Sequence, residues 1–314
     1  MDVRRLSIFL KVVDEGSFTR AADALGCSQP AVSQAIHELE VELRTLLFHR
    51  IGRRIELTPA GSALVTPAQQ LGRDLEVGRA AVRAVLGLEA GQLDIACLPT
   101  LAVAPLAPLV GAFRERHPQV LVALAAPEDT EELLNIVRSG RSEIGIVEKV
   151  SAPGLVLTDL GSQDFLVVLP PGPRRRAEIA LSEIATMPII VPPPSTSTRR
   201  LLEEAFNDAG LVPRIGVETT QREAILPLIL AGAGVGLLPR PLAELAKALG
   251  CVVAEPSPPV RRGVALIHRE GPLTPAAQAF LALAVQHAEL DHPKRSKRIL
   301  IVRDDSRENA PTQR

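Results

Sequence analysis

A short run of polar side chains near the N-terminus has the types and spacing that DNA-base recognition uses. Gln29, Ser33 and Gln34 fall on the side of a predicted helix that points away from its apolar residues. A glutamine amide can form two hydrogen bonds with adenine, and a serine hydroxyl can serve several bases. A solvated helix face is the alternative interpretation. The candidate DNA-contacting residues of this region are Thr19, Ser28, Gln29, Pro30, Ser33, Gln34 and His37.

Two short amphipathic helices must position these side chains. Ser17 precedes apolar residues at 18, 21, 22 and 25, and Ser28 precedes apolar residues at 32, 36, 39 and 43. Both sets follow helical spacing, and serine is a favoured residue at a helix start. Two helices joined by a tight turn form a helix–turn–helix, whose second helix commonly enters the DNA major groove.

A basic hairpin is predicted after the second helix. Residues 47–61 form two short extended arms around residues 51–53, and this wing carries Arg50, Arg53 and Arg54. Guanidinium groups on a small hairpin suit phosphate or minor-groove contacts. The wing therefore favours DNA binding over a merely solvated helix face.

These motifs resemble the winged helix–turn–helix of the LysR-type transcriptional regulators. The chain departs from the family at Arg44, where the family usually has glycine. Glycine adopts a left-handed helix cap freely and arginine does not, so we expect a different turn before the wing. The residues that carry the resemblance are Phe9, 16–18, Ala21, Ala22, Leu25, 28–33, Ile36, Leu39, Glu40, Leu43, Leu47, Phe48, Arg50 and 57–61.

Charge alone does not mark this region as a DNA-binding domain. Acidic and basic residues cancel through residue 58, and Glu38, Glu40 and Glu42 line the later part of the second helix. The whole chain carries a net charge of -1. Positive charge is therefore expected only locally, at Arg4, Arg5, Arg20 and the wing, and DNA binding should depend on geometry and on a dimer.

A linker helix is predicted over residues 59–90. The resemblance implies that it pairs with a second subunit in a homodimer or homotetramer, and packing on its own domain is the alternative. Pro67, Gly72 and Gly78 interrupt the segment, so a kink is expected near Pro67. Two recognition helices placed one DNA turn apart, roughly 34–36 Å, would double the readout.

Residues 91–292 alternate between strand and helix patterns, which predicts an α/β domain with a largely parallel sheet. Two α/β subdomains joined by double crossovers resemble a periplasmic binding protein, and the LysR family uses this fold to sense small molecules. The first subdomain is expected over residues 91–162 and 264–292, and the second over 163–263. The predicted strands are 93–98, 120–125, 144–147, 165–169, 188–191, 215–218 and 264–268, and the main helices include 131–138, 198–209 and 276–288.

Hydroxyl side chains recur where strands give way to helices, and helix starts after strands commonly bind anions. Each hydroxyl has an alternative role as a helix cap. Such a pocket would suit a small carboxylate, with Arg199 or Arg222 as counter-charge, whereas Glu148 favours a cationic effector. The candidate effector-binding residues are Thr100, Thr130, Glu148, Ser197, Thr198 and Arg222.

The composition bounds the remaining function classes. The chain has 314 residues, 46% hydrophobic and 23% charged, with no apolar run long enough for a membrane helix and no secretory leader. Cys27, Cys97 and Cys251 are scattered, which suits a reducing cytoplasm and a role as buried small hydrophobes. The resemblance to the LysR family, in which a peroxide-sensing disulfide of the effector domain is known, leaves only Cys97 and Cys251 as candidates for such a bond.

An enzymatic function, a metal site and a cofactor are not indicated, because no catalytic or ligand motif is present. The chain is expected to be a DNA-binding regulator that a small-molecule effector modulates. Its expected partners are double-stranded DNA and, as the resemblance implies, RNA polymerase. An effector-independent regulator acting through a protein partner and a solute-binding protein are the alternatives. Residues 293–314 are expected to form a disordered tail.

Overall fold

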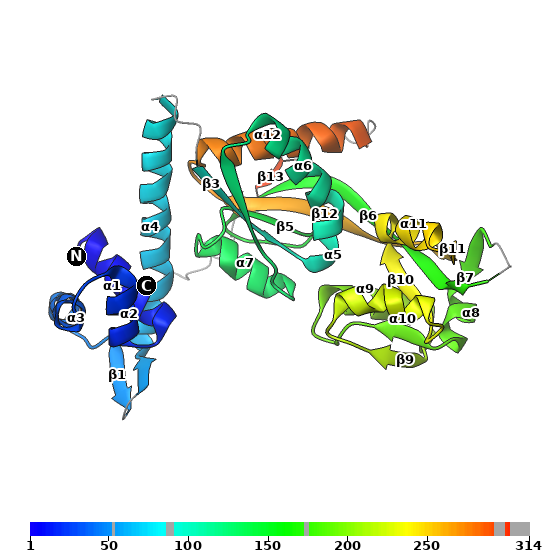
Figure 1. Ribbon diagram of the computed structural model, residues 1–314, viewed down its shortest axis with the longest axis horizontal. Coiled ribbons are helices and arrows are strands. Elements are labelled where there is room, and N and C mark those ends of the chain that lie inside the picture. The colour runs from blue at the N-terminus through cyan, green and yellow to red at the C-terminus, as the bar shows by residue number, and fades with distance from the viewer. Residues whose placement is uncertain (52–53, 86–90, 173–175, 292–298, 302–314) are drawn as a thin grey trace, which may run out of the picture. The chain divides into compact units, whose positions relative to one another are not determined.

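The computed structural model describes residues 1–51, 54–85, 91–172, 176–291 and 299–301. The chain divides into two compact units (Figure 1). The N-terminal unit holds Met1–Leu88 together with Arg138–Arg141 and Pro272–Pro275, and the C-terminal unit holds the rest.

Three helices form the first part of the N-terminal unit, and their starts and ends follow local capping rules. The Ser17 side chain accepts a hydrogen bond from the Arg20 backbone N–H, whereas Ser28 occupies the cap position without such a bond. Phe48 packs against Phe9 and Phe18, with ring centroids 5.5 and 5.8 Å apart. The predicted helix–turn–helix is thus confirmed. The helices are α1 (Val3–Glu15), α2 (Phe18–Leu25) and α3 (Gln29–Leu43).

Helix α3 ends differently from the expectation drawn from Arg44. Arg44 adopts φ 55°, the left-handed cap conformation that glycine prefers, and its N–H bonds to the carbonyls of Glu40 and Val41. It is the one non-glycine residue with positive φ among the described residues. The expectation of a different turn is therefore wrong: arginine takes the glycine-type cap, because the helix must still end before the wing.

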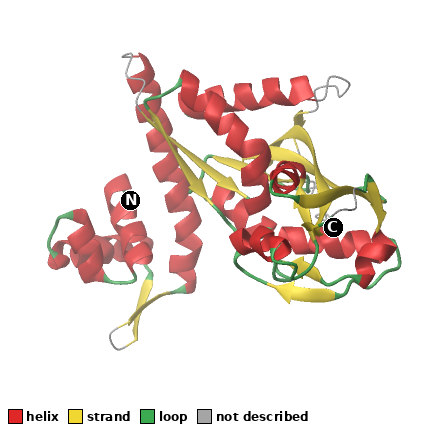
Figure 2. Ribbon diagram, turned by 45° about the vertical axis from the view of Figure 1, so that its right-hand side comes forward, coloured by secondary structure: helices red, strands yellow, loops and turns green. Residues whose placement is uncertain are grey.

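The wing is an antiparallel hairpin, visible as the pair of short strands in Figure 2. Strand β1 (Phe48–Ile51) pairs with β2 (Arg54–Leu57) in a register that sets Phe48 opposite Leu57. Thr58 then caps the next helix: its hydroxyl donates to the Leu46 carbonyl at 2.7 Å and accepts from the Gly61 N–H at 2.9 Å. These bonds join both ends of the hairpin to the helix that follows.

Helix α4 (Pro59–Val85) is a single 27-residue helix, and Pro67 lies inside it. Pro67 does not end the helix, which continues through this residue, and the kink expected there stays a prediction. Ala68 and Val77 are buried, and packing at these positions supports the segment against the loss of one backbone hydrogen bond. Leu71, Leu75 and Val82 remain exposed.

The C-terminal unit is built on one large sheet with strand order β4-β3-β5-β12-β6-β11-β7, and β10 also pairs with β6. The two central strands are β6 (Leu155–Pro171) and β12 (Val260–Arg269). Helices α6 and α12 lie on one side of its first half and α7 on the other (Figure 1). The rings of Phe113 on α6 and Phe280 on α12 are 5.6 Å apart. The elements of this first lobe are β3 (Gly91–Cys97), α5 (Pro99–Leu101), η1 (Ala102–Leu106), α6 (Ala107–Arg116), β4 (Val120–Ala125), α7 (Thr130–Arg138), β5 (Ile144–Glu148) and α12 (Pro275–Asp291).

The second lobe has its own core and a small parallel sheet of β8 and β9. Phe165, Ile189 and Phe206 are among its buried residues. Its elements are β7 (Glu178–Ala180), α8 (Leu181–Thr186), β8 (Ile189–Val191), α9 (Ser197–Asp208), β9 (Ile215–Glu218), η2 (Arg222–Ala224), α10 (Ile225–Leu230), β10 (Gly236–Pro239), α11 (Arg240–Ala248) and β11 (Cys251–Ser257).

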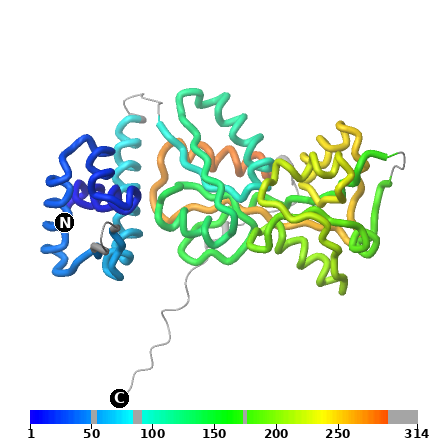
Figure 3. The backbone as a smooth tube through the Cα atoms, turned by 60° about the horizontal axis from the view of Figure 1, so that its bottom comes forward, coloured from blue at the N-terminus to red at the C-terminus, as the bar shows by residue number. Residues whose placement is uncertain are grey.

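Two long strands carry the chain between the lobes. In Figure 3 they run as the green trace of β6 (Leu155–Pro171) and the orange trace of β12 (Val260–Arg269). They pair antiparallel, with Ser162 opposite Gly263. The predicted crossover points, 162–163 and 263–264, thus lie opposite each other in this pair.

The expectation of a largely parallel sheet holds only at its margins. Strand β3 pairs parallel with β4 and β5, but every pair that includes β6 is antiparallel, as is β5 with β12. The physical reason is that β6 and β12 are return connections and not members of βαβ units.

Part of the predicted tail is ordered against this sheet. Strand β13 (Ile299–Ile301) pairs antiparallel with β6 at Val156, Leu157 and Thr158. The expectation of disorder is therefore wrong for these three residues, since a short apolar segment can pair with an open strand edge. The rest of the tail, residues 293–298 and 302–314, lies outside the described residues.

Candidate functional site

Helix α3 presents the predicted DNA-contacting side chains on one face. Gln29, Gln34 and His37 are exposed and Ser33 is partly buried, while the apolar side of the helix is buried. Gln29 Nε2 donates to Ser33 Oγ at 2.7 Å, and Gln34 Nε2 donates to Glu38 Oε1 at 2.9 Å. These bonds orient the amides, and each amide keeps a second N–H and its oxygen for contact with a base. Thr19 on α2, Ser28 and Pro30 are also exposed.

The acidic residues of α3 do not form one exposed stripe. Glu40 turns toward the wing, where Oε1 accepts from the N–H groups of Leu47 at 2.8 Å and Phe48 at 3.4 Å. Glu42 lies 3.1 Å from Arg5 Nη1. Glu40 therefore anchors the start of the wing, and Arg5, which pairs with carboxylates, is not the free positive charge that the sequence indicates.

The wing arginines fall in and beside the hairpin strands. Arg50 lies in β1 opposite Ile55, and Arg54 lies in β2 opposite Ile51. Arg53 lies outside the described residues.

A cluster of polar side chains joins the two lobes of the C-terminal unit, and Arg262 on β12 stands at its centre. Only 6% of Arg262 is exposed. Its guanidinium donates to Gln163 Oε1 at 2.8 Å, to Ser197 Oγ at 3.3 Å and to Thr100 Oγ1. Because Thr100 lies in the first lobe and Ser197 begins α9 in the second, these bonds cross between the lobes.

Glu148, at the end of β5, forms the acidic part of this interlobe cluster. Its Oε1 accepts from Thr130 Oγ1 at 2.5 Å and from Arg200 Nη2 at 2.6 Å. Its Oε2 lies 3.9 Å from Arg262 Nη1. Two guanidiniums therefore compensate this carboxylate, which removes the argument from Glu148 for a cationic effector.

The hydroxyl side chains at the start of α9 have two different roles: one caps the helix and the others join the interlobe cluster. Thr196 is the cap residue, because its side chain accepts from the Arg199 N–H at 3.2 Å. Thr198 Oγ1 lies 3.4 Å from Thr100 Oγ1 across the lobes. Ser197 and Thr198 are thus free of the capping role that was their alternative.

The two arginines proposed as counter-charges from the sequence have different environments. Arg199 is buried and bonds Glu203 at 2.6 Å and Glu218 at 3.1 Å, so it supports the second lobe. Arg222 pairs with Glu128 of the first lobe and acts electrostatically on Arg262. Arg222 therefore belongs beside the cluster and Arg199 does not.

The residues predicted from the sequence do not include Arg262, Gln163 and Arg200, which the fold brings into the cluster. The available signal is weak: Arg261 and Arg262 stand just before the apolar run of residues 264–267. Burial lowers the pKa of Arg262 to about 10, and the nearby Glu148 opposes that shift. The guanidinium therefore stays charged at neutral pH.

The three cysteines differ in exposure. Cys97 and Cys251 are buried, on β3 and β11, but Cys27 is exposed in the turn between α2 and α3. The expectation of burial is thus wrong for Cys27, because a turn between two capped helices leaves its side chain in solvent. Burial raises the pKa of the Cys97 thiol to about 12. This thiol is protonated at neutral pH and is a poor redox partner.

Each of the two units of the chain matches a known family model. A family model described as a bacterial regulatory helix–turn–helix protein of the lysR family matches residues 3–62, and a LysR substrate binding domain model matches residues 86–289. The chain belongs to the LysR family. It is a DNA-binding transcriptional regulator with an effector-binding domain and not an enzyme. The alternative of a solute-binding protein is wrong, because residues 3–62 match a DNA-binding helix–turn–helix.

Relatives of this LysR-family regulator match along most of its length. The nitrogen assimilation regulatory protein nac of Klebsiella aerogenes is 31% identical over 89% of the chain and 92% of its own length. The transcriptional activator protein LysR of Escherichia coli is 29% identical over 94% of each chain. The RuBisCO operon transcriptional regulator of Allochromatium vinosum is 28% identical over 93% and 98%.

Solved structures confirm the fold of the regulator. A full-length OxyR variant from Pseudomonas aeruginosa gives a TM-score of 0.72 at 22% identity and covers 92% of this chain and 95% of its own. CbnR, a LysR family transcriptional regulator, gives 0.65 at 22% identity over 92% and 99%. No described helix is long and apolar enough to cross a membrane.

Proposed function

We propose that this regulator senses a small anionic effector, of the carboxylate class, at the interlobe cluster. The observation that carries the proposal is the charge balance there: among the residues that the structure describes, Arg262, Arg200 and Arg222 pair with two carboxylates, Glu148 and Glu128. One positive charge therefore remains uncompensated, and it is partly withdrawn from water. Guanidinium groups with adjacent hydroxyls recognise carboxylates through charge-assisted hydrogen bonds.

The hydroxyls complete the proposed site. Thr100, Thr130, Ser197 and Thr198 come from both lobes and bond to one another or to the charged groups. An effector that bonds to groups of both lobes would favour one relative arrangement of the lobes over others, by its differential affinity for them. This gives the regulator a physical means of responding to occupancy.

DNA contact is proposed for α3 and the wing. The support is the shared exposed face of Ser28, Gln29, Pro30, Gln34 and His37 on and before α3. Ser33 and Thr19 lie beside this exposed face. Arg50, Arg53 and Arg54 of the wing would contact phosphates or enter the minor groove. The solved complex of CbnR with its target DNA shows that a protein of this fold binds DNA.

A homodimer, or a homotetramer, is proposed from helix α4. Leu71, Leu75 and Val82 are exposed apolar residues spaced by four and seven, which places them on one stripe of the helix. A second copy of α4 would cover this stripe. The same proposal places the regulator in the cytoplasm, where DNA is available, with RNA polymerase as its further partner.

Calorimetry with the full-length protein tests the effector proposal. Small carboxylates and their matched amides are titrated into wild type, and heat is expected from at least one carboxylate but not from its amide. Arg262→Gln should weaken that binding at least tenfold, because it removes the central charge. Arg261→Gln, at an exposed position of the same strand, is the matched control and should bind normally.

Two outcomes would contradict the proposal. Binding of amides or amines with equal strength would refute the anionic class. A panel that gives no heat at all would favour the alternative, a regulator that acts through a protein partner.

A further inference from the structure

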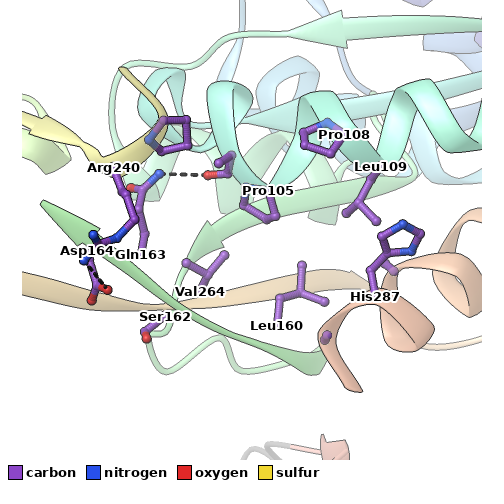
Figure 4. A pocket seen from close by; sticks show the side chains of 14 residues that line it. Pro105, Pro108, Leu109, Leu160, Ser162, Gln163, Asp164, Arg240, Val264 and His287 are labelled. Carbon is purple, nitrogen blue, oxygen red and sulfur yellow. Dashed lines mark hydrogen bonds and ion pairs between the residues drawn. The ribbon is translucent and has the colours of Figure 1, made fainter. Parts of the chain in front are cut away.

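A second pocket lies in the C-terminal unit, apart from the interlobe hydroxyls (Figure 4). Its volume is about 260 Å³. This is slightly below the roughly 300–1,000 Å³ of typical ligand pockets and suits a one- or two-ring molecule. The lining comes from η1, α6, β6, β12, α11 and α12: Ala104, Pro105, Pro108, Leu109, Leu160, Ser162, Gln163, Asp164, Arg240, Pro241, Val264, Ala284, His287 and Ala288.

The walls of this second pocket are apolar and stiff. Figure 4 shows Pro105, Pro108 and Leu109 on one side, facing Leu160 and Val264 on the other. Proline rings lose little conformational freedom when a ligand binds, so the pocket is formed in advance. The main part of a ligand must therefore be apolar.

The charged end of the pocket disfavours an anion. Arg240 is already paired with two carboxylates, Glu255 at 2.9 Å and Asp164 at 3.4 Å. Asp164 also lies 3.9 Å from Arg261 Nε, so the two arginines and two carboxylates balance to zero. A carboxylate placed here would find no uncompensated positive charge to offset its desolvation, a cost that a neutral molecule does not have.

His287 supplies the polar contact at the other end. Its Nδ1 lies 3.0 Å from the Leu283 carbonyl, which can only accept, so Nδ1 carries the proton. In the neutral ring Nε2 is then an acceptor, and it has no hydrogen-bond partner among the described residues. Such a nitrogen recognises a hydroxyl or N–H donor. Ser162 adds a half-buried hydroxyl to the same lining.

We infer that this pocket binds a neutral molecule with an apolar ring body and a hydroxyl donor, and that it is a second effector site. Gln163 links it to the interlobe cluster: Nε2 donates to the Ala104 carbonyl at 2.8 Å, within the pocket wall, while Oε1 accepts from Arg262 at 2.8 Å. An occupant would thus contact a side chain that holds Arg262. The inference rests on the pocket and holds whether or not the interlobe cluster binds a carboxylate.

The test compares 2-naphthol with 2-naphthoate, which share an aromatic body but differ in charge at neutral pH. Because the chain contains no Trp and no Tyr, naphthol fluorescence is free of protein background. Full-length protein should bind 2-naphthol saturably and at least tenfold more tightly than 2-naphthoate. His287→Leu should weaken naphthol binding about fivefold, the value of one hydrogen bond.

A matched pair of variants on α12 locates the site. Ala288→Phe fills the pocket from its rim and should weaken naphthol binding at least tenfold, while Ala282→Phe, on the exposed face of the same helix, should leave it unchanged. Circular dichroism confirms that each variant is folded. His287→Leu provides the second measurement if Ala288→Phe does not fold.

Three results would overturn the inference. They are the absence of saturable naphthol binding, tighter binding of naphthoate, and naphthol binding that Arg262→Gln abolishes but Ala288→Phe does not alter. The last result would place the probe in the interlobe cluster. Carboxylate binding at the interlobe cluster is measured by calorimetry and naphthol binding by fluorescence. The loss of one proposal can therefore be told apart from the loss of the other.

Discussion

Arg44→Gly should stabilise the N-terminal unit. Arg44 holds φ 55° at the end of α3, and its exposed side chain forms no hydrogen bond or ion pair with the described residues. A non-glycine residue in the left-handed region costs about 1–2 kcal/mol. Glycine removes that strain but gains about 0.4–1 kcal/mol of unfolded-state entropy. The net effect expected is a stabilisation of about 0.5–1 kcal/mol.

Native-state hydrogen exchange of α3 amides measures this effect in the full-length protein without requiring both units to unfold together. A stabilisation of about 0.5–1 kcal/mol slows exchange through global unfolding of the unit about two- to fivefold. Amides of β3 and β5, in the other unit, provide the internal reference and should exchange at the wild-type rate.

Gly26→Ala is the matched control with the opposite sign. Gly26 has φ 64° at the end of α2, and a Cβ there would meet nothing within 4 Å, so only backbone strain changes. Gly26→Ala should therefore speed hydrogen exchange of the N-terminal unit's amides by a similar factor. Unchanged or faster exchange in Arg44→Gly, beside faster exchange in Gly26→Ala, would show that the Arg44 side chain makes a stabilising contribution that the strain argument omits.

Four further outcomes are expected. Gly61→Ala should destabilise the N-terminal unit by about 2 kcal/mol or more in thermal melts, because a Cβ there collides with the Leu47 carbonyl. Gln34→Ala should weaken binding to a specific site more than to random DNA, whereas Arg53→Ala should weaken both and flatten the salt dependence; equal losses for Gln34→Ala on all sequences would remove its base-reading role. Leu75→Asp should shift sedimentation from dimer to monomer, and an unchanged dimer would move the interface away from α4. At pH 8 iodoacetamide should modify the exposed thiol of the helix–turn–helix turn while Cys97, with its pKa of about 12, stays unmodified by mass spectrometry.

The sequence predicts the N-terminal unit well because its signals are local. Ser17 begins a helix, the apolar spacing of α3 selects its buried side, and the wing follows from two short arms around a turn. Arg44 shows where a local rule fails, since this arginine takes the left-handed cap conformation that glycine prefers.

The interlobe site is predicted in part. Thr100, Ser197 and Thr198 follow from the rule that helix starts after strands gather at one edge of a sheet, and the fold brings them together. Arg262 and Gln163 do not follow from that rule. They meet because β6 and β12 pair antiparallel, and a pairing between residues 99 positions apart leaves no trace in local spacing.

By itself, then, the sequence determined the family, the order of elements and the exposed face of α3. Helix periodicity, caps and short motifs are set by residues a few positions apart, so they can be seen in the chain. Only the tertiary structure decided that Glu148 is compensated by arginines, that Arg262 is the centre of the cluster and that His287 closes a second pocket. Charge compensation and cavity shape depend on which distant residues pack together, and packing is a property of the folded chain.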